Sequence, residues 1–273
     1  MVTIDDEGAL EIGGARLEYR MVGQRPAEAP TLVLLHEGLG SAATWGTFPD
    51  ELAARTGAGV FTYSRAGYGR SSAAALPRPL RYMHDEAETV LPEVLERIGF
   101  RRGLLVGHSD GASIAALYLG ARQDHRVRGL VLIAPHFVVE DESIAAIRDA
   151  KRAFESGDLK PRLGRWHDDV DRTFRGWNDA WLDPRFRGWD ISDALGYVRV
   201  PLQIVQGEAD PYGTSRQIRI AEEECYCPVE VTLLPGIGHD PAREAAEPTL
   251  AAVAEFVNRI LTDHGEGGLA RAA

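Results

Sequence analysis

Short apolar segments alternate along this chain with segments of helical pattern, and this alternation constrains the fold more than any other feature. Residues 31–35 and 127–134 are apolar runs of the kind found in strands buried on both faces of a sheet. Further apolar runs occupy 59–63, 104–106, 200–205 and 229–234, and helical patterns occupy 44–56, 82–98, 112–119, 214–224 and 247–262. Strands that alternate with helices form parallel sheets with helices on both faces. An alternating pattern over residues 3–22 adds an antiparallel hairpin, so we predict an α/β fold with a mostly parallel, eight-stranded sheet.

From residue 139 to residue 197 the strand pattern stops, and the chain becomes helical, charged and rich in aromatic residues. The aromatic residues of this interval include Phe154, Trp166, Phe174, Trp177, Trp181, Phe186 and Trp189. A length of 273 residues suits one large α/β domain with an insertion. We therefore predict a core formed by residues 1–138 and 198–273 and an inserted helical cap formed by residues 139–197. The cap is expected to cover the carboxyl edge of the sheet, with most of its aromatic rings in its own core.

The composition argues against several classes of partner and cofactor. With 30 basic and 41 acidic residues the formal charge is −11, which repels nucleic acid and anionic membrane surfaces. No apolar run approaches the roughly 18 residues of a membrane span, and the first residues do not resemble a signal peptide, so we expect a cytoplasmic protein. Cys225 and Cys227 are too close for an ordinary disulfide and lack a second pair for zinc, so no metal is expected.

A serine stands at the point where an apolar run meets an Ala-rich helical segment. Residues 107–111 read Gly-His-Ser-Asp-Gly, the Gly-x-Ser-x-Gly pattern of a nucleophile elbow. In such an elbow the serine occupies a sharp turn between strand and helix, and the two glycines leave room for the neighbouring backbone. We therefore predict Ser109 as a nucleophile, with His108 close to the site.

A serine hydroxyl near neutral pH needs a general base within hydrogen-bond distance and a carboxylate that orients the base. In parallel sheets such groups gather in loops beyond the carboxyl ends of the strands. His239 follows the last apolar run after a Gly-x-Gly turn, and Asp210 follows the preceding run. We predict Ser109, Asp210 and His239 as nucleophile, acid and base, while Asp141, in the loop after residues 127–134, is the main rival to Asp210.

Five segments together resemble the α/β-hydrolase-fold serine hydrolases, over about residues 10–262. They are a His-x-Gly turn at 36–38, a Gly-x-Gly-x-Ser turn at 67–71, the elbow at 107–111, Gly-x-x-Asp at 207–210 and Gly-x-Gly-His at 236–239. The order Ser, Asp, His along the chain is also that of this fold. The resemblance implies the same three catalytic residues, no cofactor, and an oxyanion hole formed by the backbone N–H groups of Gly38 and Asp110.

The chain departs from the family pattern at two positions. Glu37 replaces the glycine that usually follows His36, and an unpaired carboxylate there would oppose the oxyanion. We hypothesise that Arg65, on the neighbouring Gly-rich turn, pairs with Glu37. A zinc motif His-Glu-x-x-His is excluded because Gly40 stands where the second histidine would be needed. Ser64 replaces a common aspartate, which indicates a different local hydrogen-bond network.

These residues predict a hydrolase that forms an acyl-enzyme on Ser109 and acts on a small ester or lactone. The Trp-rich cap and the resemblance to capped hydrolases also permit a carbon–carbon bond hydrolase of aromatic ring-cleavage products, and a thioesterase would use the same residues. A non-catalytic ligand receptor on the same fold is the alternative from another class, with Glu37 in its favour. Dehalogenases and epoxide hydrolases of this fold are disfavoured because they need a carboxylate at position 109. The expected partner is a small molecule with an apolar or aromatic part, and the oligomeric state is left open.

Overall fold

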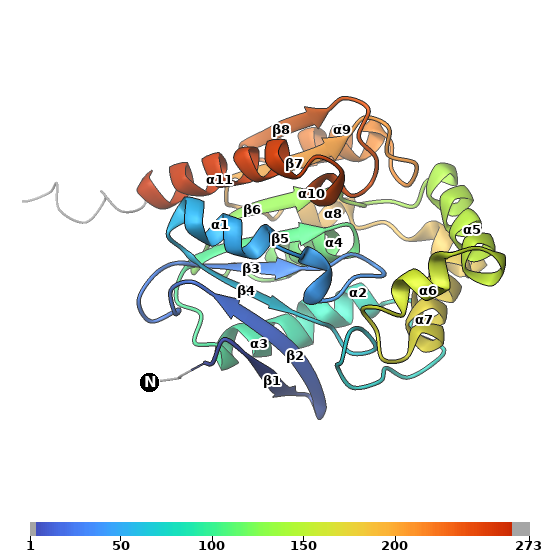
Figure 1. The fold of residues 1–273 in the computed structure, drawn as a ribbon. Helices are drawn as coiled ribbons and strands as arrows, with labels where there is room; N and C mark the ends of the chain where they lie inside the picture. The colour runs from blue at the N-terminus through green and yellow to red at the C-terminus, as the bar shows by residue number, and fades with distance from the viewer. Residues whose placement is uncertain (1–3, 264–273) are drawn as a thin grey trace, which may run out of the picture.

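The computed structural model describes residues 4–263, and these residues form one eight-stranded sheet (Figure 1). The strands are β1 (Glu7–Ile12), β2 (Ala15–Val22), β3 (Thr31–Leu35), β4 (Gly59–Tyr63), β5 (Gly103–His108), β6 (Val127–Ile133), β7 (Leu202–Gly207) and β8 (Val229–Leu234). Their order across the sheet is β1-β2-β4-β3-β5-β6-β7-β8. Strand β2 is antiparallel to β1 and β4. The other neighbouring pairs, across the order β4-β3-β5-β6-β7-β8, are parallel. The predicted mostly parallel sheet is confirmed.

Helices lie on both faces of the sheet. Outside the segment between β6 and β7 they are η1 (Ala43–Trp45), α1 (Phe48–Thr56), α2 (Tyr82–Asp85), η2 (Glu86–Val90), α3 (Leu91–Arg97), α4 (Asp110–Ala121), α9 (Ser215–Glu224), α10 (Pro241–Glu244) and α11 (Ala246–Asp263). The predicted single helix over 82–98 contains a wider π turn at η2. Pro92 has no N–H for the carbonyl of Glu88 one turn earlier, and that carbonyl accepts from Arg122 at 3.1 Å instead.

The central strands are buried on both faces, which explains why their sequences are continuously apolar. Alternate side chains of β3 point to opposite faces of the sheet. Leu32 and Leu34 belong to the cluster that packs under α1 and α11, whereas Val33 and Leu35 belong to the cluster under α3 and α4. Both clusters are covered by helices, as the alternation of strand and helix predicts.

The segment between β6 and β7 contains helices and no strand of the sheet. Its elements are α5 (Asp141–Ser156), α6 (Leu159–Leu163), α7 (Val170–Leu182), η3 (Pro184–Gly188) and α8 (Ser192–Leu195). Figure 1 shows α5, α6 and α7 beyond the end toward which the parallel strands point, whereas α8 packs on α4 and α9. The division into a core and a cap at residues 139–197 stays a prediction, and the outermost parts of the predicted core, 1–3 and 264–273, lie outside the described residues.

Within residues 4–263, no helix combines the length and the hydropathy required to cross a membrane.

Candidate active site

Ser109 occupies the turn between β5 and α4, with φ 52° and ψ −117°. A positive φ is strained for a serine, and a sharp turn of this kind lifts the side chain above the sheet. The two flanking glycines are required by close approaches of the backbone. A Cβ at Gly107 would overlap the backbone of Gly111 and Ala112, and a Cβ at Gly111 would overlap the carbonyl of Leu35. A side chain at either position would clash, so the two glycines of the Gly-x-Ser-x-Gly sequence are required for this turn.

Three side chains from distant parts of the sequence meet at the carboxyl edge of the sheet. His239 Nε2 lies 2.9 Å from Ser109 Oγ, and His239 Nδ1 lies 2.7 Å from Asp210 Oδ2. Asp210 follows β7 and His239 follows β8. The loop before His239 packs so closely on the end of β7 that a Cβ at Gly207 would overlap the carbonyls of Ile237 and Gly238. The sequence-predicted nucleophile, base and acid thus form one chain of hydrogen-bond contacts.

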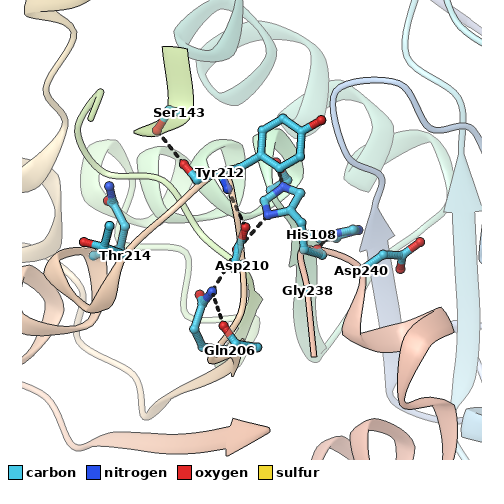
Figure 2. Close-up of polar contacts among 12 residues, drawn as sticks. His108, Ser143, Gln206, Asp210, Tyr212, Thr214, Gly238 and Asp240 are labelled. Carbon is cyan, nitrogen blue, oxygen red and sulfur yellow. Dashed lines mark hydrogen bonds and ion pairs between the residues drawn. The ribbon is translucent and has the colours of Figure 1, made fainter. Parts of the chain in front are cut away.

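The carboxylate of Asp210 is held from three sides, and its side chain is only 1% exposed. Besides His239, it accepts from Gln206 Nε2 at 2.8 Å and from the backbone N–H of Tyr212 at 2.7 Å (Figure 2). Burial alone would raise the pKa of Asp210, but the hydrogen bond and charge of His239 and the Tyr212 N–H lower it to about 2. The rival acid Asp141 is instead an exposed residue paired with Arg187 at 2.5 Å, so it lies outside the site.

Gly38 and Asp110, the two expected oxyanion residues, lie beside Ser109. Both residues line the small cavity that contains Ser109, and within residues 4–263 neither N–H donates to a protein acceptor. An unpartnered N–H next to a nucleophile is the feature required of an oxyanion hole. The side chain of Asp110 points elsewhere: its Oδ2 accepts from the hydroxyl of Tyr82 at 2.5 Å.

The hypothesis that Arg65 pairs with the Glu37 carboxylate is wrong. The buried guanidinium of Arg65 donates to the backbone carbonyls of His36, at 2.6 Å, and of Glu37, at 3.0 Å. The Arg65 N–H also donates to His36 Nε2 at 3.1 Å. The planar guanidinium fork matches two successive carbonyls of the turn, so it binds the backbone rather than the carboxylate. Arg65 and His36 therefore lie beneath the turn that carries Gly38 and do not line either cavity of the site.

His108, and not Arg65, faces the Glu37 carboxylate. His108 Nδ1 lies 3.7 Å from Glu37 Oε2, an ion-pair distance, and His108 Nε2 lies 2.7 Å from the carbonyl oxygen of His239. Burial alone would lower the pKa of His108, but the hydrogen bonding and charge of Glu37 raise it to about 9. Burial would raise the pKa of Glu37, and His108 lowers it. The Glu37 charge is thus compensated by an imidazolium that also binds the backbone of His239.

The other departure from the family pattern, Ser64, has its own hydrogen-bond network. Its hydroxyl donates to Glu18 Oε1 at 2.6 Å and accepts from the N–H of Ala42 at 2.8 Å. Ser64 therefore links the turn after β4 to β2 and to the loop after β3.

Two cavities meet at His239. The inner one has a volume of about 100 Å³ and contains Ser109, and the outer one has a volume of about 750 Å³. Both are lined by Glu37, Leu39, Tyr212 and His239. The site therefore has a small chamber at Ser109 and a larger space that His239 also lines.

Several residues of the inner cavity were not anticipated from the sequence as site residues, namely His136, Ile147, Trp177, Trp181 and Tyr212. His136 is 2% exposed and its ring packs on those of Trp181 and His239, with centroids 5.2 and 5.4 Å away. Burial lowers the pKa of His136 to about 3. Its position three residues after the end of β6, at the carboxyl edge of the sheet, is the sequence signal that could have identified it.

Comparisons with known proteins agree with this geometry. The model of the alpha/beta hydrolase family matches residues 32–252. The proline iminopeptidase of Lactobacillus helveticus (strain DPC 4571) is 32% identical to this chain over an alignment of 297 residues. The alignment covers 93% of this chain and 98% of that protein. This relative and the family model cover most of the chain.

Two solved structures share the fold at low sequence identity. The enol-lactonase from Burkholderia xenovorans LB400 has a TM-score of 0.72 and 17% identity, with 91% of this chain and 99% of that chain covered. The proline iminopeptidase from Mycobacterium smegmatis has a TM-score of 0.71 and 18% identity, with 94% and 99% covered. With the match of the family model and of the full-length relative, this protein belongs to the alpha/beta hydrolase family and is a hydrolase.

Proposed function

We propose that this protein is a cofactor-free serine hydrolase that cleaves a small ester or lactone through an acyl-enzyme on Ser109. The observation that carries the proposal is the chain of contacts from Ser109 Oγ to His239, at 2.9 Å, and from His239 to Asp210, at 2.7 Å. The unpartnered N–H groups of Gly38 and Asp110 beside Ser109 support it further. Residues 139–197 act in this proposal as a cap that encloses the acyl group.

In the first half of the reaction, Ser109 Oγ attacks the substrate carbonyl carbon while its proton moves to His239 Nε2. The carbonyl oxygen takes up the negative charge and accepts from the N–H groups of Gly38 and Asp110, and one such donor contributes on the order of 10²–10³ in rate. Asp210 holds His239 Nδ1–H and stabilises the imidazolium. His239 then gives the proton to the leaving oxygen, the carbon–oxygen bond breaks, and the acyl group remains on Ser109.

Water completes the reaction by the same route. His239 accepts a proton from the water that attacks the acyl carbon, the oxyanion forms again, and the proton passes to Ser109 Oγ as the acid departs. Every proton is thus returned, and no electron is transferred to or from an external group.

The two cavities support a substrate with a short acyl group and a larger leaving group. The inner cavity of about 100 Å³ contains Ser109 and both oxyanion residues. It has room for about three or four non-hydrogen atoms, since a water occupies about 30 Å³ in the liquid. The outer cavity is lined by His239 but not by Ser109, which suits a leaving group that His239 protonates. The indole rings of Trp177 and Trp181 favour an apolar part in the substrate.

Removal of an N-terminal proline from peptides is a second candidate. It is favoured by the full-length similarity to a proline iminopeptidase and by the carboxylate of Glu37, which lines the inner cavity and could bind a cationic ring nitrogen. Cleavage of thioesters or of carbon–carbon bonds would use the same nucleophile and base.

The test is hydrolysis of p-nitrophenyl acetate, butyrate and octanoate, a small lactone and proline p-nitroanilide by the wild type and three variants. Ser109→Ala should lower kcat by about 10⁴ to 10⁶ and abolish the burst of p-nitrophenol, and Asp210→Asn should lower kcat by about 10⁴. Ser156→Ala, at the exposed end of α5, is the matched control and should keep the wild-type rate. Equal rates for the wild type and Ser109→Ala would refute the mechanism, and tight binding without turnover would favour a receptor.

A further inference from the structure

Helix α7 carries two tryptophans one turn apart, and each is connected to one of the two proposed oxyanion residues. The indole of Trp177 lies directly against Gly38, where a Cβ would overlap its Nε1 and Cδ1. Trp181 Nε1 donates to the hydroxyl oxygen of Tyr82 at 3.1 Å, and the Tyr82 hydroxyl donates to Asp110 Oδ2 at 2.5 Å. The two tryptophans and Tyr82 are buried. A single helix from the segment between β6 and β7 is therefore connected to both residues of the proposed oxyanion hole, to Gly38 directly and to Asp110 through Tyr82.

The carboxyl group of Asp110 depends on this chain for its position. The residue is fully buried, and within residues 4–263 its Oδ1 has no hydrogen-bond partner. Burial raises the pKa of Asp110, an effect that the charge of Arg65 and the hydrogen bond of Tyr82 partly offset. Since a buried polar group without a partner is costly, the hydrogen bond from Tyr82 determines how the first residue of α4 is held. The N–H of Asp110 belongs to the same residue and moves with it.

The same two tryptophans form part of the wall of the inner cavity, together with Ile147 of α5. Protein interiors are close-packed, so an acyl group that exceeds this volume has to displace the wall. Displacement of α7 would move Trp177 away from Gly38 and Trp181 away from Tyr82. The length of the acyl group and the integrity of the oxyanion hole are therefore connected through one helix.

We propose that α7 selects substrates by acyl-chain length, because Trp177 and Trp181 hold Gly38 and Asp110 in their catalytic positions only when the acyl group fits the inner cavity. The inference rests on the proposed function and specifies it: the substrate class is esters with short acyl groups. Trp177, Trp181 and Tyr82 are positioning residues in this proposal. Because oxyanion contacts strengthen in the transition state, longer chains lower kcat more than they change KM.

The experiment measures kcat and KM for p-nitrophenyl acetate, butyrate, hexanoate and octanoate. In the wild type, kcat should fall at least tenfold from butyrate to octanoate, with a smaller change in KM. Trp181→Phe and Tyr82→Phe should each lower kcat for acetate by about tenfold and weaken the dependence on chain length. The double variant should be no slower than the slower single variant, because both substitutions break one chain of hydrogen bonds.

Ethylboronic acid, which mimics the tetrahedral intermediate on a serine, provides a readout that is independent of turnover. Its affinity should fall by about tenfold in both single variants, in parallel with kcat. Trp189→Phe is the matched control: Trp189 packs on the ring of Trp181, its buried Nε1 has no partner within the described part of the chain, and it lines neither cavity of the site. The control should stay within twofold of the wild type for every ester. Circular dichroism and thermal melting establish that each variant is folded, and Tyr82→Phe tests the chain should Trp181→Phe not fold.

Four outcomes would overturn the inference. If folded Trp181→Phe or Tyr82→Phe kept the wild-type kcat for acetate, α7 would not act on the oxyanion hole. Discrimination among chain lengths by KM alone, or an equal loss in Trp189→Phe, would indicate simple packing. A wild type that is no faster than Ser109→Ala would instead refute the proposed function, and the inference with it.

Discussion

Replacement of Glu37 by glutamine tests its ion pair with His108, the residue before Ser109. The Glu37 carboxylate lies 3.7 Å from His108 Nδ1, and the histidine side chain is 4% exposed. Against the effect of burial, Glu37 raises the pKa of His108 to about 9. In Glu37→Gln the largest effect that opposes burial is lost, and only the charge of Asp240 and the carbonyl of His239 still oppose it, so the pKa of His108 should fall. The substitution preserves the shape of the side chain and removes its charge.

The magnitude follows from the linkage between protonation and folding. A group whose pKa is raised on folding stabilises the protein fully below its unfolded pKa, here about 6.5, and this stability is lost as the pH rises through about 9. With these two values the contribution of His108 to the free energy of unfolding decreases by about 2 kcal/mol between pH 7 and pH 9. This is an upper value, since a quarter of the Glu37 side chain is exposed to solvent, which screens the pair. The lowered pKa of Glu37 reports the same interaction and is not added.

The assay is urea unfolding of the wild type and Glu37→Gln at pH 7, 8 and 9. The difference in the free energy of unfolding between the two proteins should be largest at pH 7 and shrink by up to about 2 kcal/mol at pH 9. Other titrating groups cancel in this difference. Glu142→Gln, at an exposed position of α5, is the control and should differ from the wild type by the same amount at each pH. A difference between the wild type and Glu37→Gln that does not change with pH would refute the ion pair.

Two further predictions concern the backbone beneath the site. Arg65→Lys should lower the free energy of unfolding by about 2 kcal/mol and lower kcat, because a lysine cannot donate to the carbonyls of His36 and Glu37 at the same time. Urea unfolding and ester turnover measure the two effects, and an unchanged stability would contradict the prediction. Gly111→Ala should lower the free energy of unfolding by about 3 kcal/mol, because the added Cβ would overlap the carbonyl of Leu35. In Gly188→Ala the added Cβ meets no atom within 4 Å, so this control should stay within about 0.5 kcal/mol of the wild type. Thermal unfolding compares the two variants, and equal effects would refute the steric argument.

Much of the fold could be predicted because burial and local backbone geometry leave a periodic record in the sequence. The run at residues 31–35 is strand β3 with the predicted bounds, since a strand buried on both faces is apolar at every position. The predicted helix over 44–56 is instead divided at Gly46, which has φ +57° and separates η1 from α1. The periodicity of a sequence indicates which face of a helix is buried. A single residue whose backbone angles are not helical ends the helix without changing that periodicity.

The approach of Ser109, Asp210 and His239 to one another could also be predicted, because each follows a strand of a parallel sheet and the carboxyl ends of such strands share one edge. Their catalytic roles stay a proposal, as does the division of the chain into core and cap. The partner of Glu37 could not be predicted: His108 and Arg65 both come from neighbouring segments, and the directions of their side chains decide between them.

The sequence by itself determined the parallel sheet, the sharp turn at Ser109 and the order of the three residues around it, because each depends on local pattern and on strand order. The tertiary structure alone decided that α7 places Trp177 against Gly38 and connects Trp181 through Tyr82 to Asp110. The two contacts of α7, with Gly38 and with Tyr82, join residues about 100 to 140 positions apart, and their formation depends on how a helix packs over the sheet edge, which no local pattern of residues encodes.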